Sequence, residues 1–217
     1  MDAAKLLDWF FPRRCPFCGR VNRSDLPCEN CQETLPWLVG RAAYSRVEWI
    51  DETVSALGYR GAVRHAVLEL KFGRKPARAK PLGVLTAQCA GDHLKDPFEI
   101  VSWPPLSAKR LRKRGFDQAE KLAVQVAAAY GQTPKRLFWK EERPAQSGLT
   151  DAAQRRANVL GAYHLICPEE VAGKTVLLVD DVVTTGATLS ECARLLRAAG
   201  AKRVCAVTVA KAGQGKK

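Results

Sequence analysis

Two adjacent carboxylates follow an apolar run near the C-terminus. The stretch 175–189 reads TVLLVDDVVTTGATL, and its acids are Asp180 and Asp181. A strand buried in a parallel sheet reads as a short continuous apolar run, because both of its faces are covered. A Thr/Gly loop follows the acids, and a helical pattern begins at Leu189. The stretch therefore predicts a strand that ends at the acids, then a loop, then the N-terminus of a helix.

The loop has the features of an anion site. Gly186 allows the backbone to approach a ligand closely. Free N–H groups and the dipole at a helix N-terminus favour a phosphate. The hydroxyl groups of Thr184, Thr185 and Thr188 can donate hydrogen bonds as well. We therefore expect a phosphate group at this loop.

The two aspartates suit a different part of the same ligand. Carboxylates repel phosphate, so they fit neutral hydroxyls or a bound cation beside it. Consecutive strand residues point to opposite faces, so Asp180 and Asp181 can serve one ligand only where the chain leaves the strand. A ribose 5-phosphate, which has a diol at one end and a phosphate at the other, meets both demands. The alternative is an ordinary strand-to-helix turn with solvated aspartates, and the order of run, acids, loop and helix favours the ligand.

Four cysteines form a second group of chemical interest. They are two C-x-x-C pairs separated by nine residues, namely Cys15, Cys18, Cys28 and Cys31. Zinc takes four thiolates in a tetrahedron, and two such turns can face each other across a hairpin. Disulfides need an oxidising compartment, and a thioredoxin-like redox site needs a βαβ context, so both alternatives fit less well. We expect structural zinc with no open position for catalysis.

A dense run of cations forms the third group. Residues 109–114 hold five cations in six positions, and Gly115 follows them. Cations this close repel one another unless an anion lies between them. A diphosphate or a nucleic acid backbone would relieve that repulsion, whereas a solvated basic loop is the alternative.

The composition limits the class of protein. A chain of 217 residues with 47% apolar and 26% charged residues can fold around one core with a small appendage. The formal net charge of +13 favours polyanionic partners such as nucleic acid, with a solvated basic surface as the alternative. No apolar run reaches the about 20 residues that span a bilayer. Met1 to Pro12 predicts a short amphipathic helix rather than a signal peptide, so the cytoplasm is the default location.

Strand and helix signals alternate over residues 98–210. This alternation predicts the α/β class, with a parallel sheet and right-handed crossovers. The ligand loop then lies at the carboxyl end of a strand, where such sheets bind ligands. The strands predicted besides the motif strand are Glu99–Trp103, Leu137–Phe138, Tyr163–Ile166 and Val204–Val209. In the helix after Asp117, the predicted buried positions are Leu122, Val124, Val126 and Ala127.

Together these motifs resemble the ComF family, which includes ComFC- and GntX-type proteins. The stretch 180–188 resembles the phosphoribosyl-diphosphate-binding motif of type I phosphoribosyltransferases. The resemblance also includes the paired C-x-x-C, Tyr59-Arg60-Gly61, Leu70-Lys71-Phe72, 114–118 and several residues from Gln146 to Gly161. Asp117 departs from the family's usual asparagine, which puts amide donation at this position in doubt.

The resemblance implies an architecture and a set of ligand contacts. It implies a zinc-finger-like module of four cysteines with an N-terminal helix over residues 1–45, and a phosphoribosyltransferase-like domain with a parallel sheet over residues 46–217. It implies that Asp180 and Asp181 hold ribose hydroxyls and that Thr184, Thr185, Gly186, Ala187 and Thr188 cradle the 5-phosphate. Diphosphate contacts would fall to Lys109, Arg112, Arg114 and Gly115. A mobile loop, Ala145 to Arg156, would close over the ligand.

Three functions remain open at this point. The first is a protein of natural competence, DNA uptake or DNA utilisation that binds phosphoribosyl diphosphate and single-stranded DNA, with competence-machinery proteins as partners. The second is an active phosphoribosyltransferase, in which Mg²⁺ bridges the diphosphate and the ribose hydroxyls. The third is a zinc-ribbon interaction module whose pocket only regulates or stabilises. The sequence names no acceptor and no general base.

Overall fold

A five-stranded sheet forms the centre of the computed structural model, which describes residues 14–22, 24–73, 75–142 and 159–213. The strand order is β1-β2-β7-β6-β3, and all neighbours are parallel except β1 and β2. These strands are β1 (Tyr44–Ser45), β2 (Glu52–Gly58), β3 (Ile100–Ser102), β6 (Thr175–Val183) and β7 (Arg203–Lys211). The predicted α/β class with a parallel sheet is confirmed.

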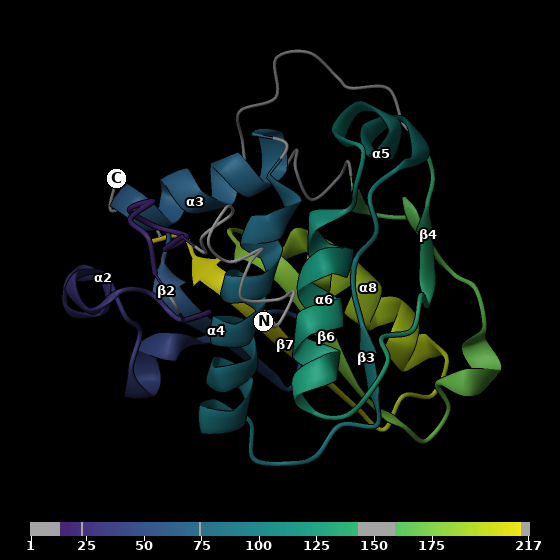
Figure 1. The fold of residues 1–217 in the computed structure, drawn as a ribbon. Helices are drawn as coiled ribbons and strands as arrows, with labels where there is room; N and C mark the ends of the chain where they lie inside the picture. Colours follow the sequence, from purple (N-terminus) through teal and green to yellow (C-terminus); the bar gives the residue numbers. More distant parts are fainter. Residues whose placement is uncertain (1–13, 23, 74, 143–158, 214–217) are drawn as a thin grey trace, which may run out of the picture.

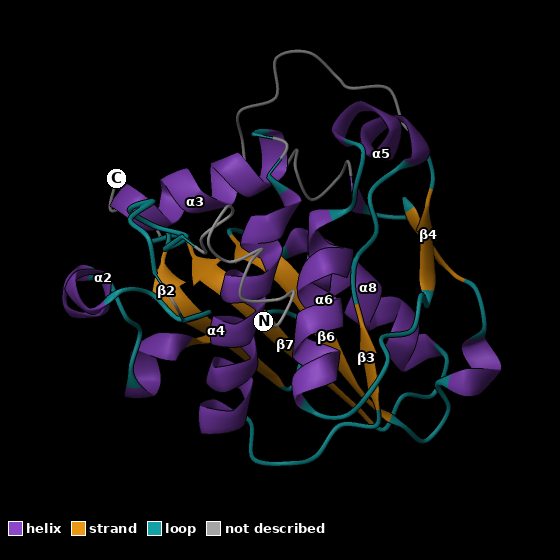
Figure 2. Ribbon diagram, in the orientation of Figure 1, coloured by secondary structure: helices purple, strands orange, loops and turns teal. Residues whose placement is uncertain are grey.

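Helices cover both faces of this sheet (Figures 1 and 2). One face carries α3 (Gly61–Phe72), α4 (Ala79–His93) and α6 (Gln118–Ala129), and the other carries α8 (Ala187–Ala198). The shorter helical segments are α2 (Glu29–Thr34), α5 (Ala108–Arg114), η1 (Gly40–Ala43), η2 (Pro76–Arg78) and η3 (Pro168–Glu170).

Strand β6 contributes to the cores on both faces. Leu177 and Val179 pack with the residues of α3, α4 and α6, whereas Val176 and Leu178 pack with those of α8. All four side chains are fully buried. The continuous apolar run in the sequence therefore arises because neither face of this strand meets water.

Two of the predicted strands do not join the main sheet. β4 (Phe138–Lys140) and β5 (Tyr163–Leu165) form an antiparallel pair of their own, so the prediction that they alternate within the parallel sheet is wrong. Trp139 stacks on His164 across this pair, with ring centroids 4.2 Å apart. Cross-strand side-chain pairs of this kind stabilise short antiparallel ladders.

The basic run and the helix that follows it also differ in detail from the predictions. Residues 109–114 belong to helix α5 rather than to a loop. In α6 the buried face is formed by Leu122, Ala123, Val126 and Ala127, whereas Val124 is exposed. Val124 follows Ala123 by one residue, a rotation of about 100° around the helix, which turns it away from the sheet.

The cysteine-rich segment packs on the α3–α4–α6 side of the sheet. Phe17 and Leu35 are buried in the same cluster as the helices of that side. Lys80 of α4 pairs with Asp25 at 2.9 Å. The helix predicted at Met1–Pro12 lies outside the described residues, and the boundary at residues 45 and 46 stays a prediction. Within the described ranges no helix is long and apolar enough to cross a membrane.

A close contact between α4 and α6 gives a test of this packing. A methyl group on Gly83 of α4 would overlap the side chain of Gln125 on α6, whose Cβ would lie only 2.4 Å away. Because overpacking costs about 1–3 kcal/mol, we expect Gly83→Ala to lower the free energy of unfolding by that amount in urea titration. Gly91→Ala on the same helix is the control, since its nearest neighbour is only the hydroxyl of Tyr130 at 3.1 Å. Equal stability of the two variants would contradict this packing.

Candidate functional site

The motif strand β6 is hydrogen-bonded to β3 on one side and to β7 on the other. Its ladder continues to Val183, so the strand does not end at the acids as predicted. The pleat therefore separates the two carboxylates. Asp180 is half-buried, whereas Asp181 is 3% exposed. The backbone N–H of Asp181 donates to Oδ1 of Asp180 at 2.7 Å, which fixes the orientation of the first carboxylate.

The loop after β6 turns at Gly186. This residue has φ +75° and serves as the N-cap of α8, and a Cβ there would lie 2.9 Å from the side chain of Val47. Glycine is required for both reasons. The N–H of Ala187 makes a long contact of 3.4 Å with Oγ1 of Thr185. The first-turn N–H groups of α8 thus lie beside two threonines, as expected for an anion site.

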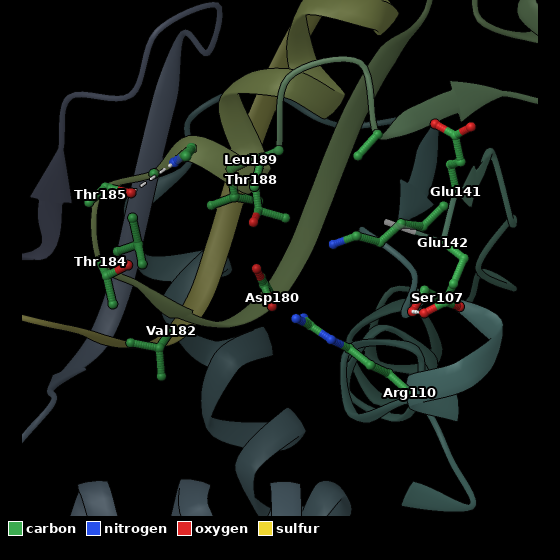
Figure 3. Close-up of a pocket in the computed structure, with 16 residues that line it drawn as sticks. Ser107, Arg110, Glu141, Glu142, Asp180, Val182, Thr184, Thr185, Thr188 and Leu189 are labelled. Carbon is green, nitrogen blue, oxygen red and sulfur yellow. Dashed lines mark hydrogen bonds between the residues drawn. The ribbon is translucent and has the colours of Figure 1, made fainter. Parts of the chain in front are cut away.

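A cavity of about 330 Å³ opens beside this loop (Figure 3). The loop Thr184–Leu189 forms one side of it, and Asp180 lies between that side and Ser107, Arg110 and Glu142 (Figure 3). The five residues predicted to cradle a phosphate all line this cavity, namely Thr184, Thr185, Gly186, Ala187 and Thr188. The structure therefore brings the predicted phosphate loop and the first aspartate to one space.

A second cavity of about 260 Å³ adjoins the first. Asp180, Thr184 and Thr188 line both, whereas Asp181 and Lys71 line only the second of the two. The two acids thus face adjacent parts of one continuous polar region.

The cations that line this region differ from the predicted set. Arg114 lines the second cavity, and Arg110 lines both. Lys109 and Arg112 are exposed and line neither of the two, so their diphosphate contact stays a prediction. Gly115 ends α5 with φ +83°. Arg110 and Arg114 are four residues apart, so reading the run as a helix would have placed both on one face.

Lys140 is a third cation of the site that the sequence did not reveal. It comes from β4, lines both cavities, and donates to the hydroxyl of Tyr163 at 2.8 Å. Burial, together with repulsion from Arg110, lowers the pKa of Lys140. It lies in a short strand without a motif, so no sequence signal could have selected it.

Asp117 shapes the segment that presents these cations. Its Oδ2 accepts the N–H of Leu106 at 2.7 Å, and its Oδ1 accepts the N–H groups of Ala119 and Glu120 at 3.0 and 3.4 Å. The side chain therefore caps α6 and anchors the turn before α5. All these contacts need an acceptor, so aspartate fills the role without amide donation.

The electrostatics of the acids differ from those of solvated aspartates. Burial, and then the neighbouring charge of Asp181, raise the pKa of Asp180 to about 7, although Lys71 opposes the shift. A carboxyl group with a pKa near neutrality in a cleft is typical of a functional site. The alternative of an ordinary turn with two solvated aspartates does not fit Asp181, which is 3% exposed.

The four predicted cysteines also meet in space. Their Sγ atoms all lie within 4.8 Å of one another, and those of Cys18 and Cys28 are 3.5 Å apart. A tetrahedral zinc site with Zn–S bonds of about 2.3 Å needs sulfur atoms about 3.8 Å apart. The N–H of Gly19 donates to the carbonyl of Cys15, and that of Cys31 donates to the carbonyl of Cys28, which forms two facing turns. The donor set therefore fits structural zinc.

Comparisons with known proteins agree with both the cysteine cluster and the parallel-sheet domain. Residues 140–217 match the phosphoribosyl transferase domain family, and residues 6–43 match the double zinc ribbon domain family. A DNA utilization protein YhgH of Escherichia coli (strain K12) is 31% identical over 199 residues, which cover 88% of this chain and 80% of that protein. Competence protein F of Haemophilus influenzae is 31% identical over 213 residues, which cover 87% and 82%.

A third relative shares a shorter region. A ribose-phosphate pyrophosphokinase of Prochlorococcus marinus is 42% identical over 129 residues, which cover 59% of this chain and 37% of that protein. The first two relatives, by contrast, match over most of both chains, and the two domain families match the two parts that the structure contains. The chain therefore belongs to the ComF family of DNA utilization and competence proteins, with a zinc ribbon followed by a phosphoribosyltransferase-type domain.

Proposed function

We propose that this chain serves DNA uptake in competence or DNA utilisation, and that it binds phosphoribosyl diphosphate with Mg²⁺ as well as single-stranded DNA. The observation that carries the proposal is the polar region at the end of β6. A carboxylate, a helix N-terminus and cations from α5 and β4 all line it. The names of the two relatives that match over most of their length support the DNA role. In that role the protein would act in the cytoplasm with competence-machinery proteins as partners.

Each part of phosphoribosyl diphosphate has a complement in this region. The 5-phosphate would lie at the loop Thr184–Thr188 and the ribose hydroxyls at Asp180 and Asp181. The diphosphate would extend toward Arg110 and Lys140, which offset its charge. Mg²⁺ held near Asp180 and Asp181 would offset part of the charge of the ligand and reduce repulsion from the acids. The name of the pyrophosphokinase relative, which states ribose phosphate as its substrate, supports this class of ligand.

The surface of α5 supports contact with single-stranded DNA. Its exposed cations include Lys109, Arg112 and Lys113, and the chain carries a net charge of +13. Neutralising backbone phosphates with such side chains releases counterions, which drives binding at low salt. Arg110 and Arg114 of the same helix line the cavities, so α5 would serve the two ligands with different residues.

A second candidate function is phosphoribosyl transfer to an acceptor, and one observation favours it. Asp180 has a pKa raised to about 7 by burial and by Asp181. A carboxylate with a pKa near neutrality can accept a proton from a nucleophile. The cations that offset the diphosphate would also stabilise it as a leaving group. Release of inorganic diphosphate in the presence of nucleobases or DNA separates transfer from binding alone.

Asp180→Asn tests the ligand assignment. We expect affinity for phosphoribosyl diphosphate in Mg²⁺ to fall roughly tenfold to a hundredfold, since a hydrogen bond to a charged group contributes about 1.5–3 kcal/mol. Isothermal titration calorimetry of the wild type and the variant measures this change. Asp92→Asn removes the same charge from an exposed position of α4 and serves as the control. Equal affinities of wild type and Asp180→Asn would refute the assignment.

Charge reversal on α5 tests DNA contact. We expect Arg112→Glu with Lys113→Glu to weaken binding of single-stranded DNA and to reduce the slope of log affinity against log salt by about 2. Fluorescence anisotropy at several salt concentrations measures both effects. Lys95→Glu with Lys121→Glu makes the same change of charge elsewhere on the surface. If both double variants lose the same affinity, net charge rather than α5 determines the binding.

Removal of the metal tests the zinc ribbon. We expect about one zinc ion per chain by elemental analysis, and loss of this ion in Cys28→Ser, because a structural site needs all four ligands. We also expect the melting temperature to fall in this variant, since zinc binding contributes to folding. Cys167→Ser, which lies outside the cluster, should keep the metal. Native protein without zinc would contradict the assignment.

A further inference from the structure

An ion pair joins helix α3 to the motif strand inside the candidate site. Nζ of Lys71 lies 2.7 Å from Oδ1 of Asp181, and the two side chains are 21% and 4% exposed. Lys71 belongs to the last turn of α3, far from the motif in sequence. Burial alone would lower the pKa of Lys71, but attraction to Asp181 raises it overall, so the amine stays charged.

The pair satisfies only half of the carboxylate. Oδ2 of Asp181 is buried and has no hydrogen-bond partner among the described residues. An unsatisfied buried oxygen is destabilising, and more so when it is charged. A pair that served stability alone would need its remaining lone pairs satisfied. The orphaned oxygen therefore points to a donor that a ligand supplies.

The surroundings of the pair define what that ligand can be. The second cavity is lined by Asp181 and by Lys71, together with Arg110, Arg114 and Lys140. Lys71 bears three N–H donors. Asp181 accepts one of them, so the other two remain for an anion. The pair itself is neutral, which lets a diphosphate approach a strand that carries two carboxylates. A sugar hydroxyl matches Oδ2, because it is neutral and can donate.

We propose that Lys71 is a positioning residue of the site: it holds Asp181 through Oδ1, leaves Oδ2 for a ribose hydroxyl, and cancels the charge of Asp181 beside the diphosphate. This inference rests on the proposed function and deepens it. The two acids then have different roles. Asp181 is a neutralised hydroxyl acceptor fixed from α3, whereas Asp180 keeps its titratable carboxyl in the cavity that the threonine loop lines.

If Lys71 has this positioning role, its removal should change the affinities for an anionic ligand and for a cation in opposite directions. In Lys71→Met, the charge of Asp181 is uncovered beside that of Asp180. We expect affinity for phosphoribosyl diphosphate with Mg²⁺ to fall roughly tenfold or more, because one partner of a buried ion pair is lost. We expect the affinity for Mn²⁺ alone to rise several-fold, because two adjacent carboxylates attract a hard cation. The paramagnetic resonance signal of the free ion measures this affinity. General disruption of the site would weaken both.

Rescue and control variants isolate the pair. Lys71→Arg should retain both wild-type affinities, and Lys71→Met with Asp181→Asn should lose the gain in Mn²⁺ affinity. Lys75→Met removes an exposed lysine of the next segment that pairs with Glu69, and should change neither. If Lys71→Met binds both ligands as the wild type does, or loses both, the positioning role is wrong. If the wild type binds no phosphoribosyl diphosphate, the proposed function fails, and a rise in Mn²⁺ affinity would then show only that the pair sets the local charge.

Discussion

The site depends on the double burial of strand β6. This strand is hydrogen-bonded on both edges and packed on both faces, so its interior positions can only be apolar. After Thr175 at its start, the polar side chains of β6 lie near its carboxyl end, where open parallel sheets bind ligands. The acids, the threonine loop and the N-terminus of α8 are therefore forced into one small region. The cations that complete the region must come from other elements.

These cations arrive on elements with different sequence relationships to the motif. Arg110 and Arg114 come from α5, which follows the neighbouring strand β3, whereas Lys140 comes from the separate β4–β5 pair. Asp117 joins the two ends of the α5 segment, because it accepts the N–H of Leu106 before α5 and that of Ala119 in α6. The carboxylate of Asp117 thus helps to position the segment that carries Arg110 and Arg114.

The predictability of each part follows from the range of the interactions that create it. Local patterns were sufficient to predict the motif strand apart from its end, the loop that follows it and the cysteine cluster, because each is specified by neighbouring residues. The antiparallel β4–β5 pair was missed because Trp139 and His164, which stack across it, are 25 positions apart in the chain. Arg110 was missed because the basic run was taken as a loop, and Val124 was misplaced by one position on its helix. The predicted closing loop, Ala145 to Arg156, lies outside the described residues.

The ion pair between Lys71 and Asp181 is another feature that depends on residues far apart in the sequence. A sequence pattern can identify paired acids, but it cannot show that a lysine from a helix distant in the sequence neutralises one of them. The pleat of β6 makes the two acids inequivalent, since it buries Asp181 and leaves Asp180 half-exposed. Without Lys71, the proposed diphosphate would lie beside two uncovered carboxylates, whose repulsion Arg110, Arg114 and Lys140 would have to offset. With Lys71, the charge of Asp181 is already paired within the protein before any ligand or cation binds.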